Sequence, residues 1–224
     1  MKITRNIFLG LFAASIVACS SAPEETVETT DAKEVVKQDK ADAYSVENGD
    51  NTITWVGFKT FGSGRHNGTI TITDGRLFVR GEALEGGKFS IDMNSIHNED
   101  LPVEGDYNQE KLVGHLKSAD FFDVANHPQA MFEITEVTAE NNEEKGTSHK
   151  VSGNLTMRGI TKNISFPATV EVTPEMVSFQ APEFSIDRKN WNVMYGSTGI
   201  EGIAKDNLID DNILLTVNLT AARK

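Results

Sequence analysis

The chain has little cysteine and little basic charge, and both shortages limit what it can be. Cys19 is the only cysteine among 224 residues, so no intrachain disulfide can form and stability must come from burial and strand pairing. Lys and Arg number 21 against 33 Asp and Glu, which gives a formal net charge of −12 at pH 7. No basic stripe with interleaved aromatic residues offsets this acidity, which argues against nucleic acid as a partner.

The sequence also lacks the motifs of catalysis and of metal binding. Its five histidines are scattered, with neither His-x-His nor His-Glu-x-x-His, so no metal site is predicted. Gly-x-Ser-x-Gly does not occur, and the glycines around residues 196–199 lack the lysine and helix of a phosphate-binding loop. We therefore predict a protein that is not an enzyme, with no catalytic residues, no metal and no cofactor.

The apolar run near the N-terminus is too short to span a bilayer as a stable helix. Lys2 and Arg5 give it a basic start, and it ends in Ile-Val-Ala directly before Cys19. This pattern resembles the lipobox of bacterial lipoproteins, in which cleavage exposes a cysteine that is diacylated. The resemblance implies a signal peptide over residues 1–18 and a lipid anchor at Cys19. An ordinary secretory signal with a chance cysteine is the alternative.

The residues after Cys19 bear on where the protein lies. Ser20 stands where the aspartate of an inner-membrane retention mark would be, which favours anchoring in the outer membrane, facing the periplasm or the cell surface. Residues 19–43 hold no aromatic side chain and more acids than lysines, so they predict a disordered acidic tether. The acidic stretch also resembles the surface-export signal of some Bacteroidota lipoproteins.

Residues 44–224 have the pattern of a single all-β domain, with apolar residues alternating along short segments. Residues 69–73 and 76–79 predict two strands joined by a hairpin turn at Asp74-Gly75, and Gly86-Gly87 is a second turn candidate. One short helix is expected over residues 107–117, because Asp106 and Gln109 resemble a capping box. About eight strands with one inserted helix favour an antiparallel barrel or sandwich.

Five runs in this domain resemble the YceI-like family in order and spacing. They are residues 89–96, residues 115–124, His127-Pro128 with Phe132, residues 153–162 and residues 184–188. The resemblance implies an extended lipocalin-like antiparallel β-barrel in the bacterial envelope that binds a polyisoprenoid or another single-chain, fatty-acid-like amphiphile, without a reaction. Such a protein would serve in transport, storage or stress-related sequestration.

The inward strand faces supply the candidate cavity wall. The candidates are Phe89, Ile91, Met93, Phe132, Ile134, Leu155, Met157, Ile164, Phe166, Phe179, Phe184, Ile186 and, near a mouth, Trp191. Arg188 and Asp120 are candidates for contact with a lipid head group, although a structural ion pair of Arg188 with an internal acid such as Asp120 is the commoner outcome for such residues.

These residues leave two interpretations open. One is a carrier whose partners are a hydrophobic lipid in the barrel and a membrane, the latter through the N-terminal anchor. The other is a non-catalytic adhesion or scaffold module with a filled barrel, which an exposed apolar patch on the outer faces would favour. The sequence does not fix the oligomeric state, and a homodimer is compatible with it.

Overall fold

A computed structural model describes residues 26–35, 41–46, 51–200, 202 and 204–223 of the chain. The strands are β1 (Thr29–Asp31), β2 (Asp42–Val46), β3 (Thr52–Phe58), β4 (Arg65–Arg80), β5 (Ala83–Asn98), β6 (Gln129–Asn142), β7 (Thr147–Met157), β8 (Ile160–Val172), β9 (Met176–Asp187) and β10 (Asn212–Arg223). The helices are α1 (Gln109–Lys117) and the short 3-10 helices η1 (Arg188–Trp191) and η2 (Lys205–Asn207). Residues 1–18 and Cys19 lie outside the described residues.

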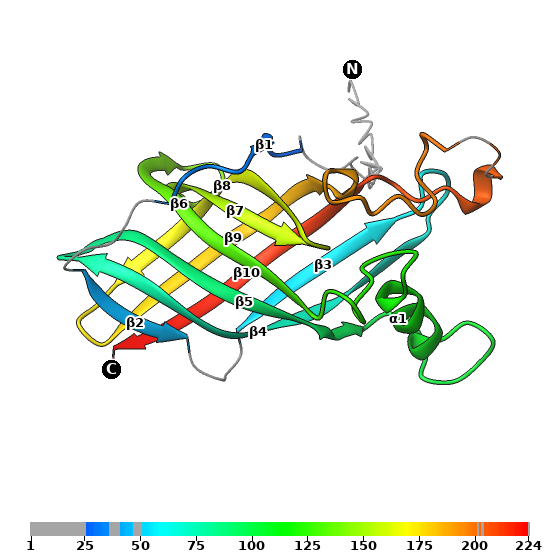
Figure 1. The fold of residues 1–224 in the computed structure, drawn as a ribbon, viewed down its shortest axis with the longest axis horizontal. Helices are drawn as coiled ribbons and strands as arrows, with labels where there is room; N and C mark the ends of the chain where they lie inside the picture. Colours follow the sequence, from blue (N-terminus) through cyan, green and yellow to red (C-terminus); the bar gives the residue numbers. More distant parts are fainter. Residues whose placement is uncertain (1–25, 36–40, 47–50, 201, 203, 224) are drawn as a thin grey trace, which may run out of the picture.

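The strands close into an antiparallel barrel, as Figure 1 shows. Each strand from β3 to β10 pairs with the next, and β10 pairs back with β3, which gives eight positions around the ring. β2 pairs with β4 and β10, the same two strands that β3 pairs with, but further along them. β2 and β3 therefore share one position of the ring. The prediction of an all-β antiparallel barrel of about eight strands with one inserted helix is confirmed.

The hairpin predicted at Asp74-Gly75 is wrong, as is the turn at Gly86-Gly87. β4 runs through the first pair and β5 through the second, and the chain turns instead at residues 81 and 82. Gly75 and Gly87 permit close contact between the strands, since a Cβ atom at Gly75 would lie 2.5 Å from the carbonyl oxygen of Lys88. The register also shifts between Ile72 and Asp74, so the glycine there accompanies a bulge rather than a turn.

The inserted helix begins later than the sequence suggests. Asn108, not Asp106, is the N-cap, and its side chain accepts a hydrogen bond of 3.0 Å from the backbone N–H of Lys111. The helix ends at Lys117, as predicted, and the Lys117 ammonium donates to the carbonyl oxygen of Asn94 on β5 at 2.7 Å. This contact helps to hold α1 against one end of the barrel (Figure 1).

The predicted disordered tether is wrong for its middle part. β8 pairs with β9 only over residues 169–172 of β8. Nearer the start of β8, residues 162–164 pair with β1 instead. The backbone N–H of Val27 donates to Ser185 of β9 at 2.8 Å, so residues 26–31 lie between the two separated strands. Backbone pairing thus orders a segment that has little apolar surface of its own. Residues 19–25 and 36–40 of the expected tether lie outside the described residues.

Candidate ligand-binding site

A cavity of about 280 Å³ lies in the half of the barrel next to α1. It is built by the pleat of the strands, because alternate residues of β3, β4, β5, β6, β7, β9 and β10 face inward. Aliphatic and thioether side chains dominate its inner wall. They are Ile53, Ile70, Ile91, Met93, Ile96, Ala130, Leu155, Met157, Ile186, Ile213 and Leu215.

Below the cavity, phenylalanine side chains fill the barrel. Phe89 and Phe184 each precede a lining residue by two positions, and Phe132 follows Ala130 by two, so these rings occupy the next inward-facing layer. The Phe132 ring centroid lies 5.4 Å from that of Phe89 and 5.5 Å from that of Phe166. Phe166 stacks on Phe184 at 4.4 Å. This phenylalanine floor (Phe89, Phe132, Phe166, Phe184) closes the cavity on one side.

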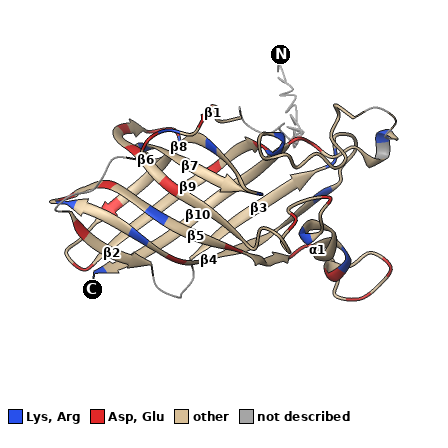
Figure 2. Ribbon diagram, viewed as in Figure 1, with Lys and Arg blue, Asp and Glu red and all other residues tan. Residues whose placement is uncertain are grey.

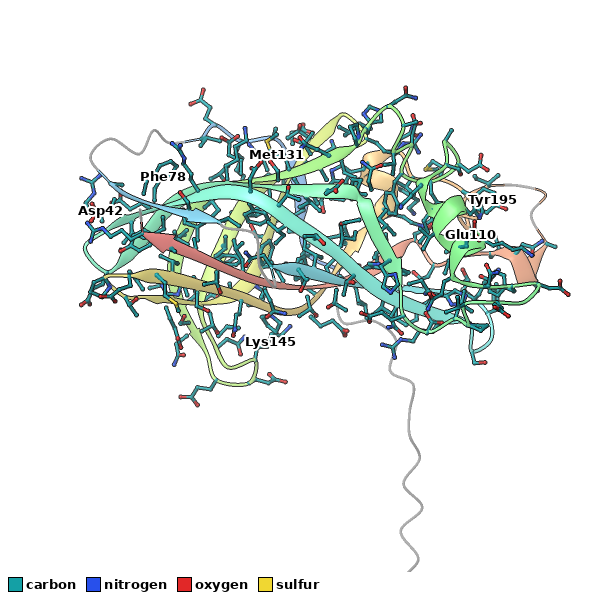
Figure 3. The ribbon with its side chains drawn as sticks, turned by 90° about the horizontal axis from the view of Figure 1, so that it is seen from below. Asp42, Phe78, Glu110, Met131, Lys145 and Tyr195 are labelled. Carbon is teal, nitrogen blue, oxygen red and sulfur yellow. The ribbon has the colours of Figure 1, made fainter. Side chains whose placement is uncertain are left out.

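The rim of the cavity is aromatic and partly polar. α1 contributes Leu112, Leu116 and His115, and the His115 ring meets Tyr195 edge-on with centroids 4.6 Å apart. Figure 3 places Tyr195 and Glu110 of α1 at the same end of the molecule, opposite Asp42. The loops at this end also carry the exposed apolar side chains of Phe61, Val103, Tyr107 and Ile200.

A hydrogen-bonded chain closes one side of the rim. Nδ1 of His66 lies 2.8 Å from the Asp100 carboxylate, and its Nε2 lies 3.1 Å from the Tyr107 hydroxyl. Burial acts to raise the pKa of Asp100, but hydrogen bonds from the backbone of Asn67 and from His66 outweigh it and lower the pKa. Although much of the Tyr107 side chain is exposed, partial burial and the charge of Asp100 raise the pKa of Tyr107. Both ring nitrogens of His66 thus have a hydrogen-bond partner in the protein, Asp100 on one side and Tyr107 on the other.

Comparison with known proteins identifies the fold's family. The family model of the YceI-like domain matches residues 44–221. The chain belongs to the YceI-like family. A UPF0312 protein of Pectobacterium atrosepticum is 40% identical over 63 residues, 28% of this chain and 30% of that protein. One from Pseudomonas putida is 34% identical over 106 residues, 46% and 48% of the two chains. The matches thus span less than half of these relatives.

Two solved structures share the barrel of this YceI-like protein. BcnA of Burkholderia cenocepacia aligns with a TM-score of 0.57 at 17% identity, over 79% of this chain and 99% of its own. A domain from Saccharophagus degradans, described as polyisoprenoid-binding and implicated in plant cell wall breakdown, aligns with a TM-score of 0.54 at 15% identity, over 83% and 100%. At such identities the likeness establishes the fold alone.

The structure divides the predicted wall residues of this YceI-like barrel into two groups. Five line the cavity: Ile91, Met93, Leu155, Met157 and Ile186. The other eight are buried but do not line it: Phe89, Phe132, Ile134, Ile164, Phe166, Phe179, Phe184 and Trp191. Trp191 is fully buried rather than open to a mouth, and its Nε1 donates to the carbonyl oxygen of Leu155 at 3.0 Å.

Arg188 is buried and structural. Its guanidinium donates to the carbonyl oxygens of Val193 (2.6 Å), Asp210 (3.0 Å) and Ile209 (3.2 Å), and it contacts the Asp211 carboxylate at 3.3 Å. Burial lowers the pKa of Arg188, whereas the neighbouring aspartates oppose this shift. Arg188 lines the cavity, but these four groups take four of its five N–H donors, so the geometry favours a structural role over the predicted head-group role.

The acid beside Arg188 is not the predicted one. Asp120 is exposed, with its carboxylate 3.7 Å from His115 Nε2, so the suggested pair of Asp120 with Arg188 does not form. Asp211 takes that place, and it also accepts from Lys189 at 2.9 Å. Burial acts to raise the pKa of Asp211, but hydrogen bonds from Lys189, Ser197 and Thr198 lower it overall. A second cavity of about 410 Å³ beside these groups is lined mainly by polar side chains.

Several lining residues are absent from the predicted set. Ile53 and Trp55 alternate with threonines on β3, so the strand pattern that identified the other segments would have found them. Leu112 and Leu116 of α1, in contrast, line the cavity only because the helix folds over the barrel end.

Within the described ranges, no group of three or more His, Cys, Asp or Glu could hold a metal, and no helix is long and apolar enough to cross a membrane.

Proposed function

We propose that this protein binds a hydrophobic single-chain lipid, isoprenoid or fatty-acid-like, without chemically changing it. The observation that carries the proposal is the apolar cavity itself, closed by the phenylalanine floor and bordered by an aromatic rim. The likeness of the barrel to the polyisoprenoid-binding domain of Saccharophagus degradans supports the ligand class. A completely filled barrel, as the scaffold alternative requires, agrees less well with this hollow half.

The cavity volume limits how much of the lipid is enclosed. At roughly 30 Å³ for each non-hydrogen atom, the share that a water molecule occupies in the liquid, the cavity holds about nine atoms. Burying nine CH₂ groups contributes about 7 kcal/mol before the cost of association. We therefore propose that one end of a longer lipid enters the barrel while the remainder contacts the rim and α1.

Native mass spectrometry of protein purified without detergent tests this function. We expect a co-purified lipid in the wild type and its loss in Ala130→Phe, because Ala130 lines the cavity and a phenyl ring there would fill it. Met131→Phe is the matched control, since the neighbouring residue of β6 faces away from the cavity (Met131 is labelled in Figure 3). Consistently empty wild-type protein, to which no added lipid binds, would contradict the proposal.

We further propose that the protein is a lipoprotein of the cell envelope, anchored in the outer membrane through Cys19. The support is the pattern of residues 1–19 in the sequence. Metabolic labelling with a fatty acid that carries an alkyne group should mark the wild type and not Cys19→Ser. Protease treatment of intact cells then distinguishes the two faces, because only a surface-exposed protein is digested.

A further inference from the structure

Trp55 lines the cavity and carries a buried polar atom, Nε1, that has no partner in the described part of the chain. The side chain stands on the inward face of β3, lines the cavity, and is 8% exposed. Four buried side-chain polar atoms in the described part of the chain have no hydrogen-bond partner, and of these only Nε1 of Trp55 belongs to a residue that lines this cavity. Less than 1 Å² of this atom is accessible, so bulk water does not satisfy it.

The second tryptophan provides a contrast within the same molecule. Nε1 of Trp191 is also buried, but it donates to the carbonyl oxygen of Leu155. An indole N–H can only donate a hydrogen bond. A state in which this buried donor lacks an acceptor is disfavoured by roughly ten- to a hundredfold relative to a state in which it has one. The fold supplies an acceptor to the tryptophan outside the cavity wall and none to the tryptophan within it.

Space for an acceptor lies beside the Trp55 indole. Gly57 is the next residue on the same face of β3 and also lines the cavity, and a Cβ atom there would have no other heavy atom within 4 Å. Across the strand pair, Gly68 leaves room for the indole, whose Cζ2 would lie 2.9 Å from a Cβ atom at that position. A rotation of the ring away from Gly68 and toward the open space at Gly57 would bring Nε1 to the cavity.

Neighbouring polar groups have partners already. His66, one layer closer to the rim, is bonded to Asp100 and Tyr107, and the guanidinium of Arg188 is bonded to backbone carbonyl oxygens. Lys59, another basic side chain of the lining, also has an interaction within the protein. An ionised ligand group beside Trp55 would thus have to compete for cations that the protein already uses, which is costly in an apolar wall, whereas a neutral oxygen needs a single donor.

We propose that Nε1 of Trp55 donates a hydrogen bond to a neutral oxygen of the bound lipid, such as that of an alcohol, an ether or a carbonyl group. This inference rests on the proposed lipid-binding function and adds a chemical class to it. Trp55 lies one layer above Ile53 and Ile70 and one layer below His66. The oxygen therefore enters the cavity and does not stay at the rim.

The test compares decanol, decane and decanoate as probes in heteronuclear NMR of the full domain with labelled indole groups. The chain has two tryptophans, so two indole N–H signals are expected. Decanol should move the Trp55 signal downfield, as hydrogen bonding requires, and leave the Trp191 signal in place. It should also bind about tenfold more tightly than decane or decanoate.

Two variants separate the role of the N–H from that of the ring. Trp55→Phe keeps an aromatic side chain and should reduce decanol affinity about tenfold, to the level of decane, without changing decane binding. Trp191→Phe removes the same atom outside the cavity and should leave the preference for decanol unchanged. The persisting signal of the remaining tryptophan verifies folding in each variant.

The outcomes distinguish this inference from the function on which it rests. If none of the three probes binds, the proposed function fails. If decane and decanol bind equally well and the Trp55 signal moves equally with both, lipid binding stands and the role of Trp55 is refuted. Tighter binding of decanoate than of decanol would equally overturn the neutral-oxygen assignment.

Discussion

The phenylalanine floor should set the length of chain that the barrel accepts, and Phe132→Ala tests this. Phe132 is 3% exposed and its ring lies over Gly153, where a Cβ atom would be 2.2 Å from the ring. Since Gly153 has no side chain, β7 cannot fill the space that the substitution leaves. We therefore expect the free energy of unfolding to fall by about 3–5 kcal/mol, the range for a buried phenylalanine truncated to alanine.

A bound chain should recover much of this loss. The substitution removes six of the seven side-chain carbons, so the deeper cavity accepts about six more carbons of a ligand chain at about 0.8 kcal/mol for each CH₂ group. Urea unfolding with saturated alcohols of increasing length measures the effect. Stabilisation of the wild type should level off near about nine or ten chain atoms, and that of Phe132→Ala near about fifteen or sixteen.

Phe179→Ala is the matched control for the floor. Phe179 is fully buried and meets Phe166 edge-on, with ring centroids 6.4 Å apart. It lies on the far side of the phenylalanine floor and does not line the cavity. It should lose comparable stability while keeping the chain-length limit of the wild type. If stabilisation of Phe132→Ala levels off at the same chain length as that of the wild type, the phenylalanine floor does not limit the depth that the ligand reaches, and our interpretation of the cavity is refuted.

Three further predictions concern the structure around the cavity. Arg188→Met should lower the free energy of unfolding by at least about 3 kcal/mol in urea, because several buried carbonyl oxygens lose their donor. Folding lowers the pKa of Asp211, so ionised Asp211 stabilises the fold fully above the unfolded-state pKa of about 4, and this stabilisation disappears as the pH falls through the folded-state pKa. Asp211→Asn should therefore remove this part of the pH dependence of the unfolding free energy. A pH profile that matches the wild type would contradict the prediction. Asn154→Ala should expose the Lys33 amide to hydrogen exchange, because the Asn154 side chain accepts from that amide at 3.0 Å.

The strand faces were predictable from the sequence, and the depth of each residue along the barrel was not. Alternation identifies Phe89 and Ile91 equally as inward-facing, yet one fills the floor and the other lines the cavity. Layer position depends on register between strands, which bulges alter, as at Asp74. A glycine after an aspartate suggested a turn because the same residue pair suits both a tight turn and a strand bulge.

Contacts that depend on loops were harder still to predict. The acid beside Arg188 comes from Asp211, 23 residues further along the chain, and no local pattern connects the two. Charges are interspersed along the strands and on α1, so composition did not single out that pair (Figure 2). The missed Trp55, in contrast, stood in an alternating segment, and the same strand reasoning would have included it.

The pairing of β1 has a consequence for how the barrel would stand on a membrane. Thr26 donates through its hydroxyl to the Asn212 side chain at 2.7 Å, and Asn212 lines the cavity. Thr26 is seven residues after Cys19, and a fully extended chain of that length reaches about 25 Å. With a lipid on Cys19, as proposed, the chain would attach at the cavity end of the barrel and could not carry it far from the bilayer. The anchor would then determine which end of the barrel stays close to the lipid phase, and not only which compartment holds the protein.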